Sequence, residues 1–414
     1  MKEKFYDVII IGGGPSGATC GIFLKKLDPS LRVCIIDKES FPRKKPCGDG
    51  LSPGVVDIIN EAGFGEFFFE RFPISNFELS CGNSIDIKYD LRNLFESNSY
   101  GFVYQRELFD EKLIDCAVKA GVDFFQKHNI AEIREIEPWR TQVSCRYDRD
   151  NFQFIGKIIV GADGANSKIR SYLKIPSNDD RHMGIGLKYY CSYKGSDEMS
   201  LRIDILKSLK SSYGWFFPFS KDLANIGIGV NVDVYKKYKI NLNKEFDNYL
   251  LFLKDKMQLE LIPGSRGGYP LPYGSQMPKL VHGNKVLIGD AASMINPLTG
   301  EGIYYGMYAG KALAANIAGS FGSGDELGTA LQKFSVDFQN RFQNHYKLNL
   351  RIKNLLSSPF SGILLKALAK DKVLLGKVMG IMLGNSNSFN VENFSLKVIK
   401  KSTKYIYEQF KSHI

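Results

Sequence analysis

Hydrophobic positions in the first forty residues follow the pattern of a strand, a helix and a second strand. Residues 6–11 end in four consecutive aliphatic side chains and lack polar alternation, which is typical of a strand buried in a parallel sheet. After the glycine-rich segment 12–17, apolar side chains recur at helical spacing through residues 18–27. Residues 32–36 then form a second apolar strand that ends at Asp37. The pattern predicts a βαβ unit.

Further along the chain the pattern changes to short strands and then to helices. A helix is predicted from Glu107 to Ala120, with Gly121 as its stop, and helical spacing returns from Gly302 to about residue 384. Strand-rich stretches separated by turn signals occupy residues 74–90, 141–160, 183–207 and 212–231. Because no repeat or Ser/Gly linker separates these regions, the sequence predicts interleaved domains.

Length and composition are those of a folded chain of two or three domains. The 414 residues are 44% hydrophobic and 24% charged, which excludes disorder as the main state. No window of about 18 apolar residues occurs, so we expect neither a spanning helix nor a signal peptide, and we expect a cytoplasmic protein. The seven cysteines are scattered without a CxxC pair, which predicts reduced thiols and argues against a thiol-disulfide reductase or a metal site.

Positive charge is concentrated at the carboxy-terminal end. The formal net charge is +11, and residues 351–414 hold eleven Lys and Arg against three acidic residues. No zinc-finger spacing or RNA-binding motif accompanies this charge, so we expect no nucleic-acid partner. An apolar stripe among the lysines of residues 364–382 could dock on an anionic membrane, or the helices could cap a domain with a solvated basic face.

The glycine-rich segment has the context of a dinucleotide fingerprint. Gly12, Gly14 and Gly17 follow a strand and open a helix, and Asp37 ends the next strand twenty residues after Gly17. Missing side chains let the backbone approach a pyrophosphate, the helix N-terminus supplies N–H donors, and Asp37 can accept from a ribose hydroxyl. We include Ser16 with these cofactor-binding residues.

Two later segments indicate which dinucleotide is bound. Residues 157–167 contain Asp163-Gly164 after a strand, and residues 286–302 contain Gly289-Asp290-Ala291-Ala292 followed by Pro297, Gly300 and Gly302. With the fingerprint, these motifs resemble the p-hydroxybenzoate-hydroxylase-like FAD enzymes. The resemblance implies FAD as cofactor, with Asp163, Gly289 and Asp290 binding it and the 297–302 segment bringing a helix N-terminus to the flavin pyrimidine edge.

The same resemblance bears on basic residues near the fingerprint. It places a residue at the position of Arg106 on the FAD phosphates; the alternative is a surface arginine at a helix start. Residues 43–45 are interpreted as a solvated loop. No second complete glycine fingerprint occurs, so reducing equivalents are expected from NAD(P)H by transient contact or from a reduced carrier protein.

Two further segments resemble the geranylgeranyl reductase family. The first is the loop Cys47-Gly48, and the second is Tyr213-x-Trp215-x-Phe217-Pro218, which matches the family pattern Y-x-W-x-F-P. The resemblance places the first loop over the flavin, so Cys47 and Gly48 are also predicted to bind the cofactor. The related halogenases carry W-x-W-x-I-P at the second segment. One departure is Asp49, where many relatives have another glycine.

The residue chemistry is compatible with alkene reduction. Saturating an unpolarised alkene requires a hydride at one carbon and a proton at the other. Tyr213, Trp215 and Phe217 share one face of a strand at period two, as a cavity wall that stabilises cationic character or as core. Cys47 could donate the proton or position a substrate, or it could simply let the loop approach the cofactor.

These expectations combine into one prediction. The fold class is α/β: a Rossmann-type FAD-binding domain (1–73, 98–175 and 265–320), an antiparallel substrate domain (74–97 and 176–264) and a helical C-terminal region (321–414). The resemblance implies reduction of carbon-carbon double bonds in a prenyl substrate, with a possible peripheral location on the inner face of the cell membrane. The alternatives are a flavin monooxygenase or halogenase, and a non-catalytic membrane-associated flavoprotein.

Overall fold

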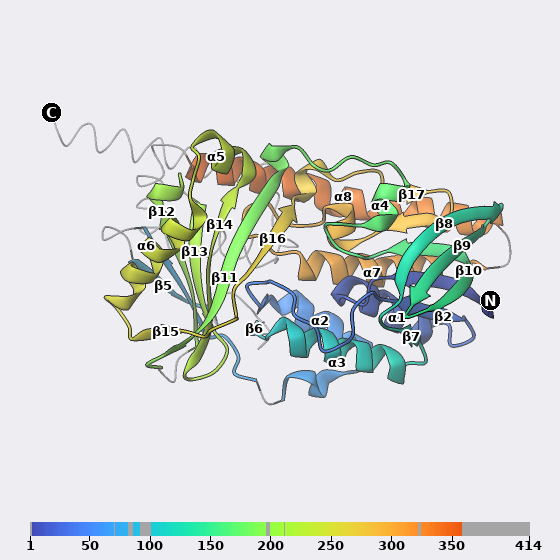
Figure 1. The fold of residues 1–414 in the computed structure, drawn as a ribbon, viewed down its shortest axis with the longest axis horizontal. Helices are drawn as coiled ribbons and strands as arrows, with labels where there is room; N and C mark the ends of the chain where they lie inside the picture. The colour runs from blue at the N-terminus through green and yellow to red at the C-terminus, as the bar shows by residue number, and fades with distance from the viewer. Residues whose placement is uncertain are drawn as a thin grey trace.

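The computed structural model describes residues 2–69, 71–81, 86–91, 101–195, 199–210, 212–321 and 324–357. Two large sheets lie next to each other along the long axis of the molecule, and a long helix runs past both (Figure 1). This arrangement confirms the predicted α/β class. The predicted apolar stripe at 364–382 lies outside the described residues. Of the basic carboxy-terminal residues 351–414, the structure describes only those up to residue 357.

The first sheet is built around the predicted βαβ unit. Its core strands are parallel, with β1 between β10 and β2, and the run Val8–Ile10 is fully buried. In spatial order the strands are β17 (Val281–His282), β18 (Lys285–Leu287), β10 (Asp150–Gly161), β1 (Lys2–Ile11), β2 (Val33–Ile36) and β7 (Asp123–Phe125), with β9 (Arg140–Tyr147) paired to β10 and β8 (Asn129–Glu137) paired to β9.

Helices α1 (Pro15–Leu27), α3 (Arg106–Lys119) and α7 (Ile303–Ile317) pack together beside this sheet. The α1–α7 contact is close because α7 presents glycines to it: a Cβ on Gly310 would lie 2.9 Å from the backbone nitrogen of Cys20. A Cβ on Gly306 would overlap the Ser16 side chain. The glycines of α7 therefore bring the third FAD motif against the first.

The second sheet contains the predicted substrate strands. In spatial order they are β15 (Leu259–Leu261), β11 (Met183–Tyr193), β14 (Leu223–Asn231), β13 (Ser212–Pro218), β12 (Ser200–Leu206), β4 (Asn76–Ser80) and β5 (Asp86–Asp90), and β16 (Gly267–Pro272) also pairs with β11. The pairs are antiparallel except β4 with β12, which run parallel. Helix α6 (Leu242–Lys254) buries Phe246, Tyr249 and Leu253 against one face of this sheet.

The remaining elements connect the two sheets. The short strands β3 (Gly50–Leu51) and β6 (Phe102–Val103) pair beside the Cys47 loop. Helix α8 (Gly324–Leu356) packs on α7 and reaches the second sheet, as Figure 1 shows. The other helices are α2 (Pro53–Ala62), α4 (Lys168–Tyr172) and α5 (Val232–Lys237), with 3-10 turns η1 (Gly65–Phe68), η3 (Asp180–His182), η4 (Lys207–Leu209), η5 (Gly274–Gln276) and η6 (Gly289–Ala292).

No helix in the described part of the chain is long and apolar enough to cross a membrane.

Candidate active site

The glycine loop between β1 and α1 has the geometry of a phosphate-binding turn. Gly12 has a φ of 107°, and a Cβ there would overlap the carbonyl of Ala162. A Cβ on Gly17 would overlap the carbonyl of Gly12, so both positions require glycine for packing. Gly14 differs, because a Cβ there would meet only Arg43 Nη2, at 3.4 Å. Gly14 therefore exposes its backbone on the side where a pyrophosphate would bind.

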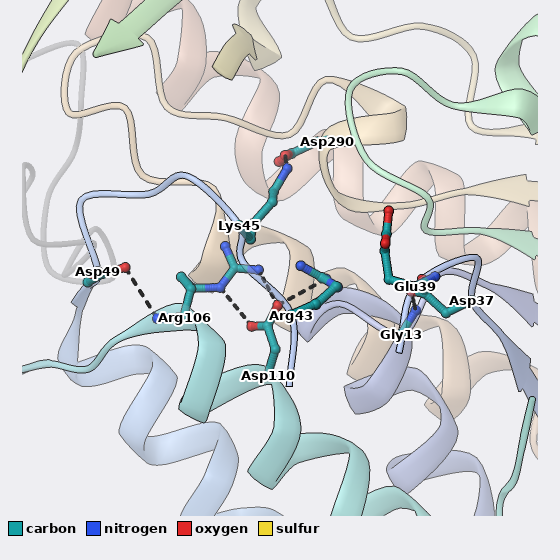
Figure 2. Close-up of polar contacts among 9 residues, drawn as sticks. All are labelled: Gly13, Asp37, Glu39, Arg43, Lys45, Asp49, Arg106, Asp110 and Asp290. Carbon is teal, nitrogen blue, oxygen red and sulfur yellow. Dashed lines mark hydrogen bonds and ion pairs between the residues drawn. The ribbon is translucent and has the colours of Figure 1, made fainter. Parts of the chain in front are cut away.

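Asp37 lies beside this loop, as the fingerprint predicts. Its Oδ2 accepts a 2.7 Å hydrogen bond from the backbone N–H of Gly13, and its Oδ1 accepts one of 2.9 Å from Glu39 (Figure 2). The carboxylate thus fixes the loop in addition to any contact with a ribose. Ser16, on the first turn of α1, lies between Gly289 and Gly306 and joins the first and third motifs.

Arg106 forms part of a buried cluster of charges next to Gly14. Its Nε and Nη2 each donate a 2.7 Å hydrogen bond to Asp110, and Arg43 Nη2 lies 3.0 Å from the same carboxylate (Figure 2). Burial alone would lower the pKa of Arg106, but Asp110 and the Cys47 thiol raise it above its ordinary value. Two guanidinium groups share one carboxylate, so the cluster carries a net positive charge that suits a pyrophosphate.

The expectation of a solvated loop at residues 43–45 is wrong for two of its three residues. The side chains of Arg43 and Lys45 are only 13% and 17% exposed. Lys45 Nζ lies 2.9 Å from the centroid of the Tyr269 ring and 4.0 Å from Asp290 Oδ2, and burial lowers the pKa of Lys45 to about 8. These side chains are covered because the loop packs against the cofactor motifs in the folded protein. The polar sequence of the loop does not reveal this packing.

The second and third motifs also lie close to the glycine loop and to the helix that follows it. Asp163 Oδ2 accepts from the backbone N–H of Lys168 at 2.6 Å, and its Oδ1 is buried without a hydrogen-bond partner among the described residues. Burial raises the pKa of Asp163. Gly289 and Asp290 belong to η6, and Asp290 lies next to Gly302, the N-cap of α7. The second motif therefore lies against Gly12 of the glycine loop, and the third against the N-terminus of α7.

Asn296 shapes the segment that precedes α7. Its Oδ1 accepts from the backbone N–H groups of Leu298 and Thr299, and its own N–H donates to the carbonyl of Glu301. Asn296 Nδ2 donates to the hydroxyl of Tyr305, which contacts His345 Nε2 of α8 at 2.7 Å. Segment 297–302 is thereby held in a fixed turn just before the N-terminus of α7. The partial positive charge of a helix N-terminus suits the flavin ring, which carries negative charge when it is reduced.

The aromatic face of β13 contacts the third cofactor motif at one end and the Cys47 loop at the other. Tyr213 Oη donates a 2.6 Å hydrogen bond to the carbonyl of Thr299. A Cβ on Gly48 would lie 3.5 Å from both Trp215 Nε1 and Phe217. The predicted period-two face therefore points toward the cofactor motifs, and the opposite face, with Gly214 against Tyr249, packs on α6.

The Trp215 indole lies across glycines of the neighbouring strands. A Cβ on Gly227 would overlap the ring, and Cβ atoms on Gly186 and Gly229 would lie 3.7 and 3.9 Å from it. Gly186 and Gly229 are direct cross-strand partners in β11 and β14. Glycines within Gly184-Ile185-Gly186 and Gly227-Ile228-Gly229 therefore make room for an indole.

Cys47 is half-buried, whereas the other six cysteines are buried, and all seven are free thiols. Burial raises the pKa of the Cys47 thiol, while the Arg106 guanidinium and the Asp49 backbone N–H oppose the shift. The thiol therefore stays protonated near neutral pH, with two groups beside it that stabilise a thiolate.

Three residues of the candidate site were not predicted from the sequence. Asp110 follows Arg106 by four residues, a helical spacing that could have indicated the ion pair. Asn225 is a polar residue within the apolar run of β14 and contacts Trp215, Cys47 and Asp49. Glu301 lies within the third motif, and burial raises its pKa to about 7.

The geometry fits FAD. Gly14 leaves the backbone open, Arg43 and Arg106 provide positive charge, and the orphaned Asp163 Oδ1 provides an unsatisfied acceptor nearby. Residues 5–186 match the family described as FAD binding domain. The protein is a FAD-dependent oxidoreductase.

Known proteins similar to this oxidoreductase include reductases. A menaquinone reductase of Mycobacterium tuberculosis is 27% identical over 329 residues, 76% of each chain. A digeranylgeranylglycerophospholipid reductase of Methanocella arvoryzae is 25% identical and covers 86% of this chain and 88% of that one. A geranylgeranyl bacteriochlorophyll reductase-like structure from Thermoplasma acidophilum shares the fold with a TM-score of 0.79 and 23% identity, covering all of both chains. Flavin-dependent halogenases also share the fold, with TM-scores of 0.71 and 0.70.

These similarities confirm the predicted resemblance to the geranylgeranyl reductases and FAD as the cofactor. They also favour an enzyme over the non-catalytic alternative.

Proposed function

We propose that this oxidoreductase saturates carbon-carbon double bonds in an isoprenoid chain of the geranylgeranyl type. The observation that carries the proposal is the position of the β13 aromatic face, which borders the cofactor motifs through Tyr213 and the Cys47 loop through Trp215 and Phe217. An apolar aromatic wall at this place suits an alkene without polar groups. The reductase names of the similar proteins support the same chemistry.

FAD would be held by Gly12, Gly14 and Gly17, by Asp37, Asp163 and Asp290, by Arg106 and Arg43, and by segment 297–302 including Gly300 and Gly302. Reduced FAD supplies the hydride when it is bound. The protein residues have other tasks. The three aromatic rings of β13, Tyr213, Trp215 and Phe217, exclude water from the site. Each ring would stabilise positive charge that develops on the prenyl chain by roughly 0.5–2 kcal/mol.

Cys47 holds the proton that the second alkene carbon receives. Burial keeps its thiol protonated, because the pKa of Cys47 is raised, and Arg106 and the Asp49 backbone N–H stabilise the thiolate left after transfer. The net change is one hydride and one proton added across the double bond, with the proton later restored from solvent.

The electron donor, location and membrane contact are proposals of the same kind. NAD(P)H by transient contact, or a reduced carrier protein, would deliver electrons, because the sequence has no second complete glycine fingerprint. The basic carboxy-terminal residues would attract the protein to the inner, anionic face of the cell membrane, where prenyl lipids reside.

Product mass tests the proposal directly. Enzyme reduced with dithionite is incubated anaerobically with a geranylgeranyl lipid, and the lipid is analysed by mass spectrometry. The proposal predicts products heavier by two hydrogens per saturated bond. No saturated product in this incubation, together with oxygen-dependent products in a parallel aerobic one, would favour a monooxygenase or halogenase; flavin-dependent halogenases share this fold.

A further inference from the structure

We propose that Asn225 is a positioning residue that locks Cys47 and Trp215 at a fixed separation through Asp49. The proposal rests on the proposed function, in which Cys47 and Trp215 face the substrate. It adds a residue that no sequence motif indicated, on β14, an interior strand of the second sheet.

Asn225 is fully buried, and its side-chain amide contacts both segments of the site. Its Oδ1 accepts a 2.9 Å hydrogen bond from Trp215 Nε1. Its Nδ2 donates to the carbonyl oxygen of Cys47 at 2.7 Å and to Asp49 Oδ2 at 2.8 Å. Both N–H groups and the oxygen of the amide are therefore used, two on the loop and one on the indole.

Asparagine is required here by the pattern of donors and acceptors. Aspartate would place a second carboxyl group against Asp49 and against the carbonyl of Cys47, and even when protonated it could donate only one of the two hydrogen bonds that the amide donates. Alanine would leave the Trp215 N–H and the Cys47 carbonyl without partners in a buried region. Neither change touches the glycine loop that holds the pyrophosphate.

Asp49 transmits the restraint because it is itself held on several sides. Tyr190 Oη donates to its Oδ2 at 2.8 Å, the backbone N–H of Arg106 donates to its Oδ1 at 3.3 Å, and Tyr104 N–H donates to its carbonyl at 2.9 Å. Asp49 is fully buried with a φ of 64°, a conformation that glycine adopts easily. A glycine at this position would keep the turn but would lose the carboxylate that binds Asn225.

These contacts give a role to Asp49, at the position where many relatives have glycine. In this chain side chains fasten the loop to two strands of the second sheet, through Tyr190 on β11 and Asn225 on β14, and Asn225 in turn accepts a hydrogen bond from Trp215 on β13. The backbone of Cys47 and the indole of Trp215 are therefore held by the same side-chain amide.

The test uses three variants of the FAD-loaded protein: Asn225→Asp, Asp49→Asn and the double exchange. The first readout is the labelling rate of Cys47 by a water-soluble disulfide reagent, since the other six cysteines are buried. The second is Trp215 fluorescence in a Trp139→Phe background, where Trp215 is the single tryptophan. The matched control is Asn284→Ala, which changes a buried asparagine in the turn between β17 and β18 that bonds Thr141 and Lys157.

We expect Asn225→Asp to label about tenfold faster and to shift the emission of Trp215. The double exchange should recover part of both changes, because the new amide at position 49 can donate to the new carboxylate at position 225, while the Cys47 carbonyl still lacks its donor. Asn284→Ala should leave labelling and emission unchanged even if it melts at a lower temperature.

Unchanged labelling and emission in Asn225→Asp would overturn the proposal, and so would a double exchange without any recovery. If Asn225→Asp fails to fold, Asp49→Asn decides the question. Labelling of Cys47 faster than in wild type would support the proposal, and labelling at the wild-type rate would overturn it. Neither readout needs turnover, so changed labelling in an enzyme that reduces no prenyl lipid supports the lock and overturns the reductase function alone.

Discussion

The hydroxyl of Tyr213 donates a 2.6 Å hydrogen bond to the carbonyl oxygen of Thr299 and thereby joins the second sheet to the turn before α7. Thr299 belongs to the segment that would border the flavin, and Tyr213 belongs to the aromatic face that would border the substrate. The proposed cofactor and substrate surfaces are thus tied by one hydrogen bond.

Removing this contact should loosen the junction without emptying the FAD site. Tyr213→Phe keeps the ring but leaves the Thr299 carbonyl without its donor, at a cost of about 1 kcal/mol in free energy of unfolding. Urea unfolding of the FAD-loaded protein measures this change. Tyr172→Phe, a half-exposed tyrosine on α4, is the control and should unfold like wild type.

FAD retention tests the glycine loop. Gly14→Ala places a methyl group on the side where the pyrophosphate would approach, and Asp290→Ala removes an acceptor next to the α7 N-cap, so both should lose most of their FAD. Absorbance at the flavin band after gel filtration measures the loss. Gly65→Ala, on a turn away from the motifs, should keep its FAD. Yellow, saturated Gly14→Ala protein would contradict the placement.

Asp110 should matter more to the FAD-free protein than to the loaded one. Asp110→Asn leaves Arg106 and Arg43 facing each other without a shared carboxylate, a change that costs about 3–5 kcal/mol for a buried pair. Bound pyrophosphate would neutralise the same guanidinium groups and reduce this cost. Thermal melts of apo and loaded variant and wild type measure the difference, and equal destabilisation in both states would place the phosphates elsewhere.

Glu301 gives the stability a specific pH dependence. Burial raises its folded-state pKa from 4.5 to about 7, so between these values the folded state binds more protons than the unfolded state. Stability should therefore fall as pH rises from about 4.5 to about 7, by roughly 1–3 kcal/mol. Glu301→Gln should remove this dependence, whereas Glu260→Gln, at an exposed position, should retain it. Urea unfolding at pH 5 and pH 7.5 makes the comparison.

The sequence predicted those parts of the site that depend on local pattern. The glycine fingerprint, the position of Asp37 directly after β2 and the shared face of Tyr213, Trp215 and Phe217 follow from spacing along one or two elements, and the structure has them as expected. The domain boundaries and the roles of the site residues stay predictions.

The parts that the sequence did not predict depend on contacts between distant segments. Arg43 and Lys45 belong to a polar stretch, yet Asp110, Tyr269 and Asp290 cover them. Asn225 lies 178 residues from Cys47 in the chain, and no local pattern connects the two.

The most direct measurement of the central claim is the anaerobic re-oxidation of reduced enzyme by a geranylgeranyl lipid, followed by stopped-flow flavin absorbance. Wild-type enzyme should be re-oxidised by the lipid without oxygen. Cys47→Ala should slow this step by roughly 10²–10⁴-fold and Trp215→Leu by about tenfold, while both keep FAD and its reduction by dithionite. If Cys47→Ala is unimpaired, another group supplies the proton. Reduced wild-type enzyme that is re-oxidised by oxygen but by no polyprenyl alkene would contradict the reductase account.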